Sequence, residues 1–128
     1  MENRLNPGLA HTSELTVDRS NTAEQMGSGD MPVLATPAMA ALMENAAMLA
    51  VSPHLDEGDT TVGSALSISH LLPSPIGATV SATATLERQD GRRLDFRVEA
   101  RCGDALIGEG THVRYIVSRD RFLAKLSK

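Results

Sequence analysis

Residues 36–51 read Thr-Pro-Ala-Met-Ala-Ala-Leu-Met-Glu-Asn-Ala-Ala-Met-Leu-Ala-Val. This stretch predicts an α-helix, because Pro37 is tolerated in a first helical turn and Pro53 ends the apolar run. Apolar side chains occupy nearly the whole circumference, so we expect the helix to be buried. Glu44 is its one ionisable residue, and a buried carboxylate costs several kcal/mol unless it is paired or hydrogen-bonded. Glu44 is therefore the first candidate for chemistry.

Alternation of apolar and polar residues predicts strands on both sides of this helix. The predicted strands are His11–Asp18, Thr61–Leu71, Ala78–Gln89, Arg93–Cys102 and Ala105–Val117. The pairs Asp90-Gly91 and Gly103-Asp104 are typical of tight turns, so they predict hairpins. We expect residues 1–10 to fray, residues 19–32 to form a loop and residues 72–77 to form a turn.

One strand, one helix and four further strands indicate an α+β protein with an antiparallel sheet of about five strands. A flat sheet covers one face of a helix, whereas this helix is apolar on most sides. We therefore expect the sheet to curl around the central helix, or a partner subunit to cover the rest. The 128 residues fit a single domain, 1–128, with Met39, Met43 and Met48 as core residues.

Composition excludes several classes of protein. Cys102 is the single cysteine, and the N-terminal segment lacks the basic and apolar regions of a signal peptide, so we expect a cytoplasmic protein. Charged residues interrupt every apolar stretch before it reaches about 20 residues, which argues against a membrane span. The net charge of −4 argues against a general nucleic-acid binder. The charge is nonetheless uneven, at −8 up to Glu87 and +4 from Arg88 onward.

Candidate chemistry rests on a histidine and a carboxylate. His70 is able to transfer protons near neutral pH, and Glu44 is able to orient it or to activate water. Backbone amides near Gly63 or at the helix start are candidate donors for an oxyanion. His11, His54 and His112 do not form a metal-ligand cluster with Cys102 by their spacing in the sequence. We therefore expect no metal and no cofactor.

Four segments carry a resemblance to a known family: Val33–Thr36, Leu42–Glu44, Val62–His70 and Gly110–Arg114. In their order and spacing they resemble the hotdog-fold thioesterases related to fluoroacetyl-CoA thioesterase. The resemblance extends over about residues 12–126, and it implies hydrolysis of an acyl-CoA thioester to a carboxylate and free CoA.

The resemblance also implies a set of site residues. Matching the motifs to this chain makes Thr36, Glu44 and His70 the catalytic group, with Gly63 near the acyl group and Arg114 near the substrate. Segment 26–35 departs from the family, because it lacks the phenylalanines that precede the catalytic threonine in the fluoroacetyl-CoA enzyme. We therefore expect a different acyl group, of ordinary short chain length.

Helix geometry adds a constraint on this set. Thr36 and Glu44 are eight residues apart, which separates them by roughly 12 Å along one helix. Substrate length or a second subunit must therefore connect them. Relatives with the hotdog fold place their sites at dimer interfaces, so we expect a homodimer whose sites combine groups from both chains.

Each assignment has a structural alternative. Thr36 is a candidate helix cap, Glu44 a carboxylate held by backbone amides, and His70 a packed core residue. Gly63 is also explained by crowding against the helix, and Arg114 by a solvated strand face. Two other functions on the same fold stay open, namely a non-catalytic module that binds acyl-CoA or a small acid, and an enoyl-CoA hydratase.

Overall fold

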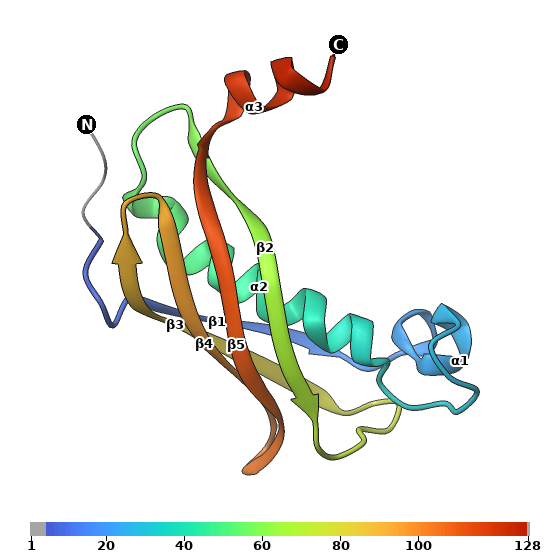
Figure 1. Ribbon diagram of the computed structural model, residues 1–128. Coiled ribbons are helices and arrows are strands. Elements are labelled where there is room, and N and C mark those ends of the chain that lie inside the picture. The colour runs from blue at the N-terminus through green and yellow to red at the C-terminus, as the bar shows by residue number, and fades with distance from the viewer. Residues whose placement is uncertain (1–4, 128) are drawn as a thin grey trace.

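The structure is a computed structural model that describes residues 5–127. Strand β1 (Ala10–Thr16) comes first, and two short helices, η1 (Arg19–Asn21) and α1 (Ala23–Met26), lead to the central helix α2 (Thr36–Val51). A turn of 3-10 helix, η2 (Ser52–His54), follows. The chain then forms β2 (Asp59–His70), β3 (Thr79–Asp90), β4 (Arg93–Cys102) and β5 (Ala105–Ser118), and ends in α3 (Arg119–Leu126) (Figure 1).

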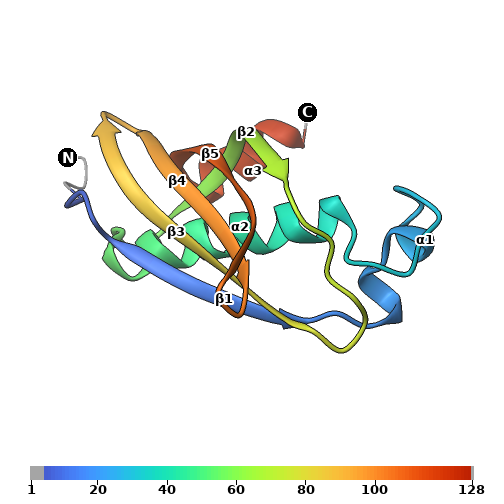
Figure 2. The ribbon, with the colours of Figure 1, turned by 90° about the horizontal axis from the view of Figure 1, so that it is seen from below.

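The five strands form one antiparallel sheet in the order β1-β3-β4-β5-β2. Seen from below, the sheet curls around α2 (Figure 2). This arrangement confirms the predicted α+β fold with a sheet wrapped around one helix. One connection differs from a simple series of hairpins, because β2 pairs with β5 and not with β3. Strand β2 therefore lies at an edge of the sheet.

Both predicted hairpin turns are confirmed. Gly91 and Gly103 each have a φ of 62°, in the left-handed region that glycine adopts without steric cost. The first turn joins β3 to β4, and the second joins β4 to β5, at the boundaries expected from the sequence. These turns bring the C-terminal half of β5 beside β2, where the candidate site residues lie.

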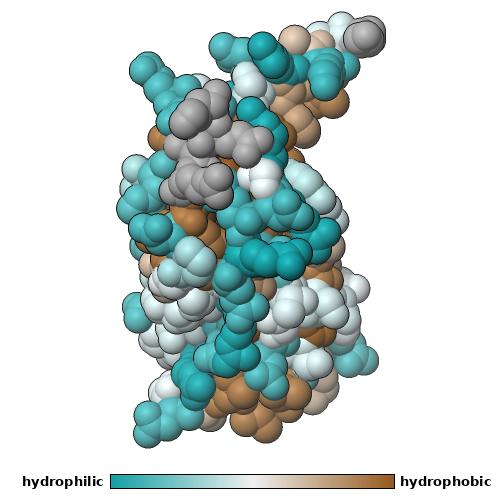
Figure 3. Space-filling model, turned by 60° about the vertical axis from the view of Figure 1, so that its left-hand side comes forward, coloured by the Kyte–Doolittle hydropathy of each residue, from teal (hydrophilic) through white to brown (hydrophobic). Residues whose placement is uncertain are grey.

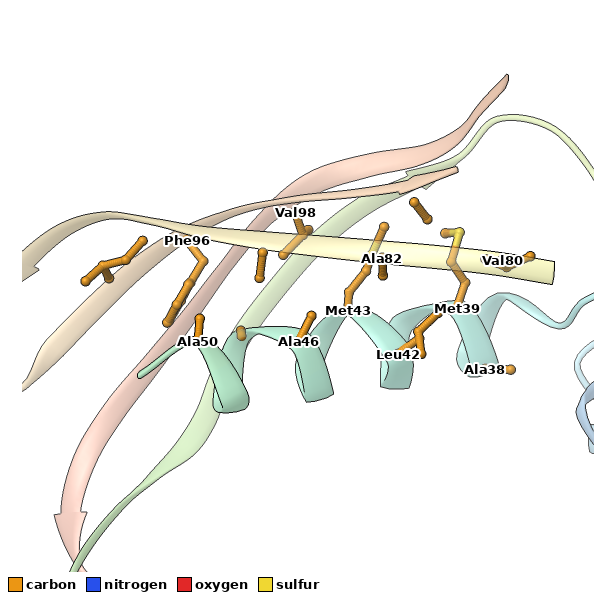
Figure 4. Close-up of a cluster of buried hydrophobic side chains, with 14 of the residues drawn as sticks. Ala38, Met39, Leu42, Met43, Ala46, Ala50, Val80, Ala82, Phe96 and Val98 are labelled. Atoms are coloured by element: carbon orange, nitrogen blue, oxygen red, sulfur yellow. The ribbon is translucent and has the colours of Figure 1, made fainter. Parts of the chain in front are cut away.

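The core lies between one side of α2 and the sheet. Met39 and Met43 on α2 point toward the sheet, the latter toward Ala82 on β3 (Figure 4). Phe96 on β4 points toward Ala50 of the same helix (Figure 4). All five are buried, which confirms the packing role expected for the first two methionines. Burying a methionine or phenylalanine side chain contributes roughly 1.5–3 kcal/mol, so this side of α2 fixes the helix against the sheet.

The opposite side of α2 is more open than the sequence suggested. The helix packs mainly against β1 and β3 and makes fewer contacts with β2 and β5. Ala41 and Asn45 are exposed, and Glu44 is half-buried. The expectation that α2 is buried on every side is therefore wrong for a single chain. Glu44 faces a hollow between α2 and the β2 edge and does not lie in the core.

Four short helical elements were not predicted from the sequence, namely η1, α1, η2 and α3. Segment 19–32, expected to be a loop, contains η1 and α1, and the Oγ1 of Thr22 caps α1 by accepting from the amide of Gln25. The alternating pattern of the last strand also did not indicate α3. The Oγ of Ser118 caps this helix by accepting from the amide of Arg121. Helix α3 projects from the body of the molecule (Figure 1).

The N-terminal residues behave differently from the expected fraying. Leu5 is buried, and the amide of Gly8 donates to the carbonyl of Leu86 over 2.8 Å. Residues 1–4 lie outside the described part of the chain. The face in Figure 3 is mostly hydrophilic, with apolar areas at its lower end and beneath the C-terminal helix. Within residues 5–127, no helix is both long and apolar enough to cross a membrane.

Candidate active site

Two separate hollows lie along α2. The first, here called the threonine hollow, measures about 290 Å³ and lies beside the start of the helix. Its lining includes Thr36, His70, Ser28, Val33, Leu71 and Leu72. The second, here called the glutamate hollow, measures about 490 Å³ and lies near the middle of the helix. Its lining includes Glu44, Asn45, Met48, Thr61, Gly63 and Arg114.

Thr36 and His70 are in direct contact in the threonine hollow. The Oγ1 of Thr36 lies 2.7 Å from Nδ1 of His70 at the end of β2. Thr36 is the first residue of α2, and Ala35 occupies the capping position without a side-chain hydrogen bond. The interpretation of Thr36 as a helix cap is therefore wrong. Its hydroxyl is instead free to donate to a neutral imidazole, as a hydroxyl nucleophile does to its base.

The surroundings of His70 favour the neutral imidazole. Burial lowers the pKa of His70 below its ordinary value, and the Leu72 backbone opposes this to a smaller degree. His70 is half-buried and lines a hollow, so it is not a residue packed inside the core. Its Nε2 atom is buried and has no hydrogen-bond partner within the described residues. In the neutral ring with its proton on Nε2, the Nδ1 lone pair is available to accept a proton from Thr36.

Glu44 faces Gly63 across the glutamate hollow. A methyl group on Gly63 would lie 3.3 Å from Oε2 of Glu44, so the carboxylate sits directly above the β2 backbone. Strand β2 has an irregularity between Gly63 and Ala65, where one extra residue enters the pairing with β5. Glu44 has no hydrogen bond or ion pair with any residue in the range 5–127. The adjacent Asn45 binds Ser13 instead, with 2.7 Å between Ser13 Oγ and Asn45 Oδ1.

Arg114 crosses the same hollow from β5. It is 7% exposed, so the interpretation as a solvated surface residue is wrong. Its Nε donates to Oγ1 of Thr61 over 2.8 Å, and its NH2 donates to the Thr61 carbonyl over 2.9 Å. Burial lowers the pKa of Arg114, and the charge of Glu44 raises it. Two hydrogen bonds thus hold a buried cation beside a carboxylate.

His112 is a member of this cluster that the sequence analysis considered only as a metal ligand. It is 1% exposed, and its Nε2 accepts from NH1 of Arg114 over 3.2 Å. The signal was present in the sequence, because residues two apart on a strand share a face, and Thr-His-Val-Arg puts His112 and Arg114 on the inner face of β5. Within residues 5–127, no cluster of His, Cys, Asp and Glu is arranged to hold a metal ion.

The five predicted site residues thus form two groups within one chain. Thr36 and His70 line the threonine hollow, whereas Glu44, Gly63 and Arg114 line the glutamate hollow. The two hollows share no lining residue. A single chain therefore holds a hydroxyl–imidazole pair in one place and a carboxylate beside a buried cation in another.

Comparison with known proteins places this chain in a family. The family model described as fluoroacetyl-CoA-specific thioesterase matches residues 17–120, which include every candidate site residue. The chain belongs to the fluoroacetyl-CoA-specific thioesterase family. The fluoroacetyl-CoA thioesterase of Streptantibioticus cattleyicolor is 42% identical over 94 residues, which cover 73% of this chain and 68% of that protein.

Solved structures of fluoroacetyl-CoA-specific thioesterases have the same fold. One is 34% identical to this chain with a TM-score of 0.89, covering 98% of this chain and 97% of that one. A threonine-to-serine variant in complex with acetyl-CoA is 32% identical, with a TM-score of 0.90 and coverage of 96% and 97%. A thioesterase superfamily member from Thermus thermophilus is 29% identical, with a TM-score of 0.90 and coverage of 97% and 92%. The fold is therefore the hotdog fold of thioesterases, and the protein is a thioesterase.

Proposed function

We propose that the protein hydrolyses short-chain acyl-CoA thioesters to a carboxylate and free CoA, in sites shared between two copies of the chain. In this proposal Thr36, Glu44 and His70 are catalytic, and Gly63 and Arg114 bind the substrate. The contact of 2.7 Å between the Thr36 hydroxyl and the His70 imidazole carries the proposal, because it supplies a hydroxyl with its base inside a hollow.

The Thr36–His70 pair acts on the acyl carbonyl. In one route, His70 takes the hydroxyl proton while Thr36 Oγ1 bonds to the carbonyl carbon. The carbon–sulfur bond then breaks, and the CoA thiolate leaves with the electron pair and accepts a proton. A thiolate is a good leaving group near neutral pH, since a thiol pKa is about 8.5. In the other route, Thr36 orients the acyl group and water attacks directly.

Glu44 activates the water in both routes. A carboxylate without a hydrogen-bond partner is able to accept a proton from water as the oxygen attacks the carbonyl or the acyl-enzyme. Arg114 supplies a fixed positive charge, and the backbone amides at the irregular part of β2 near Gly63 are candidate donors for the oxyanion. Such groups are preorganised, so they need little reorganisation when negative charge develops on the carbonyl oxygen.

A second copy of the chain brings the two hollows together. Strand β2 lies at a sheet edge, and Gly63, Ser64 and Ala65 on it are exposed. An exposed sheet edge beside the open side of α2 is a surface that proteins usually cover. We propose a homodimer whose two-fold axis lies near β2, with the carboxylate of one chain close to the Thr36–His70 pair of the other, which gives two such sites.

The threonine hollow indicates the acyl group. Leu71, Leu72 and Val33 contribute apolar surface to its lining, and no Asp, Glu, Lys or Arg is among its lining residues. Residues 26–35 carry no aromatic side chain, so the wall that precedes Thr36 lacks large planar groups. We propose an uncharged, aliphatic short-chain acyl group, without selectivity for a fluorinated one. We also place this activity in the cytoplasm, consistent with the single cysteine.

Thiol release from a panel of acyl-CoA thioesters tests the proposal. The panel contains acetyl-, propionyl-, butyryl-, fluoroacetyl- and malonyl-CoA, with unaltered protein, Glu44→Gln and His70→Ala. We expect release from the uncharged short chains and a loss of about 100-fold or more in each variant, the usual contribution of a proton-transferring group. Full activity in both variants would remove these residues from the mechanism.

The same assay separates the alternatives. Saturable binding of acyl-CoA without thiol release would identify a binding module. Loss of the conjugated chromophore of crotonyl-CoA without thiol release would identify a hydratase.

A further inference from the structure

Arg114 and Glu44 are opposite charges that line one hollow without forming an ion pair. The ion pairs of 4.0 Å or less within residues 5–127 all lie on β3 and β4, and none joins Arg114 to Glu44. Both groups nevertheless surround Gly63, where a methyl group would lie 3.3 Å from Glu44 Oε2 and 3.4 Å from Arg114 NH1. Something therefore holds the guanidinium away from the carboxylate.

Arg114 is restrained by two hydrogen bonds to Thr61 and by a third, from NH1, to His112. The Nδ1 of His112 lies 2.8 Å from the Ala65 carbonyl, and its Nε2 lies 3.2 Å from Arg114 NH1. A carbonyl only accepts and a guanidinium only donates, so Nδ1 carries the proton and Nε2 presents its lone pair. The network therefore requires a neutral imidazole. Burial favours the same state because it lowers the pKa of His112. The hydrogen bond to Ala65 raises this pKa to a smaller degree, the charge of Arg114 lowers it, and the charge of Glu44 raises it.

The imidazole is also held rigidly in place. His112 is 1% exposed, and its ring packs against Phe96 with 6.2 Å between ring centroids. Ala65, which accepts from Nδ1, adjoins the irregular part of β2 next to Gly63. One ring thus joins the backbone beside Gly63 to the guanidinium of Arg114.

We propose that His112 is a positioning residue that holds Arg114 NH1 back from the Glu44 carboxylate, and so keeps the carboxylate free to act as a base. An ion pair with Arg114 would make the carboxylate a weaker base, because a neighbouring cation stabilises its charged form. Held at its present position, Arg114 still contributes positive charge to the hollow. The inference rests on the proposed function of Glu44 and adds the residue that controls it.

Thr61 shares the positioning of Arg114, and His112 adds the contact to NH1. The charged or titratable residues facing Glu44 are Arg114 and His112, both on β5. Strand β2 contributes Thr61, Val62 and Gly63 to the hollow, and the adjacent Asn45 on α2 is already bonded to Ser13. Thr61 binds the Nε and NH2 of Arg114, which leaves His112 as the acceptor for NH1 in the described part of the chain.

Two substitutions separate the two hydrogen bonds of His112. In His112→Asn the amide nitrogen replaces Nδ1 and donates to Ala65, but no acceptor remains for Arg114. In His112→Gln the side-chain oxygen replaces Nε2 and accepts from Arg114. We expect kcat for acyl-CoA hydrolysis to fall about tenfold or more in the asparagine variant, with a smaller change in KM, and to be largely retained in the glutamine variant. His54→Asn, at an exposed histidine, is the control.

A double-mutant cycle distinguishes positioning from a general effect on folding. If His112 acts through Arg114, His112→Asn has little further effect on kcat in an Arg114→Gln background. Equal losses in both backgrounds would overturn the proposal. Circular dichroism and thermal unfolding establish that each variant is folded.

Two measurements do not depend on activity. The ¹⁵N spectrum of the imidazole in unaltered protein should show the neutral Nδ1–H form between pH 6 and 8. A crystal structure of His112→Asn should show Arg114 within 4 Å of Glu44. If the unaltered protein hydrolyses no acyl-CoA, the proposed function fails while these two results still decide the role of His112. A protonated ring, an Nε2–H tautomer, or an unmoved Arg114 in the asparagine variant would overturn it.

Discussion

The carboxylate of Glu44 lies directly over the backbone of Gly63, so that a methyl group on Gly63 would be 3.3 Å from Oε2. The same methyl group would be 3.3 Å from Cε1 of His112. Gly63 thus allows a helix residue and a strand residue to approach one point on β2. Crowding therefore explains this glycine and also gives it a role in the site, because the side chains that crowd it belong to the candidate site.

Gly63→Ala should therefore leave the fold intact and impair the site. The backbone at Gly63 does not have a positive φ, so alanine introduces no backbone strain. The added methyl group displaces Glu44 or Arg114 by a few tenths of an ångström, and a small misplacement of a catalytic group costs about 10-fold to 100-fold in rate. Thiol release and thermal unfolding measure the two effects. His54→Asn, at an exposed residue that lines neither hollow, is the control and should retain full activity.

Thr36 has two proposed roles, either to attack the acyl carbonyl or to orient the acyl group. Thr36→Ser keeps the hydroxyl beside His70 and should retain most of the activity, whereas Thr36→Ala should lose about 100-fold or more. Mass spectrometry of the unaltered protein, quenched during turnover, should show an acyl group on Thr36 if its oxygen attacks. Turnover by Thr36→Ala at the unaltered rate would exclude both roles.

The pH dependence of kcat/KM should reflect the neutral form of His70. Burial lowers the pKa of His70 from its ordinary value of 6.5, so the ring stays unprotonated to a lower pH than a solvent-exposed histidine. Activity should therefore decline on the acid side with a midpoint below pH 6.5. A midpoint above pH 6.5 would contradict the role of His70 as the base for Thr36.

Gly108 on β5 packs closely against Met39 on α2, outside the candidate site, so substituting it should change the stability of the protein. A methyl group on Gly108 would lie 2.5 Å from Sδ of Met39 and 3.0 Å from the Ser69 carbonyl. Overpacking of this kind lowers the free energy of unfolding by about 1–3 kcal/mol. Chemical denaturation of Gly108→Ala, Met39→Leu and the double variant measures the coupling. The double variant should be more stable than the sum of the two single effects indicates, because leucine is shorter than methionine.

The sequence was sufficient for the fold because each element has a strong local pattern. The apolar run from Thr36 to Val51, the alternation along β3 to β5 and the glycine turns each specify an element without long-range information. The edge position of β2 is different, because alternation does not say which strand pairs with which. Strand β2 directly precedes β3 in the chain but pairs with β5.

The sequence was less informative about the surroundings of the site residues. Counting apolar residues around the helix placed Glu44 in the core, whereas the curled sheet leaves that side of α2 open. His112 was considered only for metal ligation, because its role depends on contacts with Ala65 and Arg114 that arise from strand pairing. Helix α3 follows a long strand and begins at Arg119, and its capping residue, Ser118, is a weak signal by itself.

Mixing two inactive variants tests most directly whether Thr36 and Glu44 of different chains form one site. Thr36→Ala and Glu44→Gln, each inactive alone, are combined under conditions that exchange subunits, and native mass spectrometry measures the heterodimer. If each site takes Thr36 from one chain and Glu44 from its partner, half of the sites in each heterodimer are unaltered, and the mixture should regain about a quarter of the original activity. Heterodimers that form without any gain in thiol release would contradict the shared site.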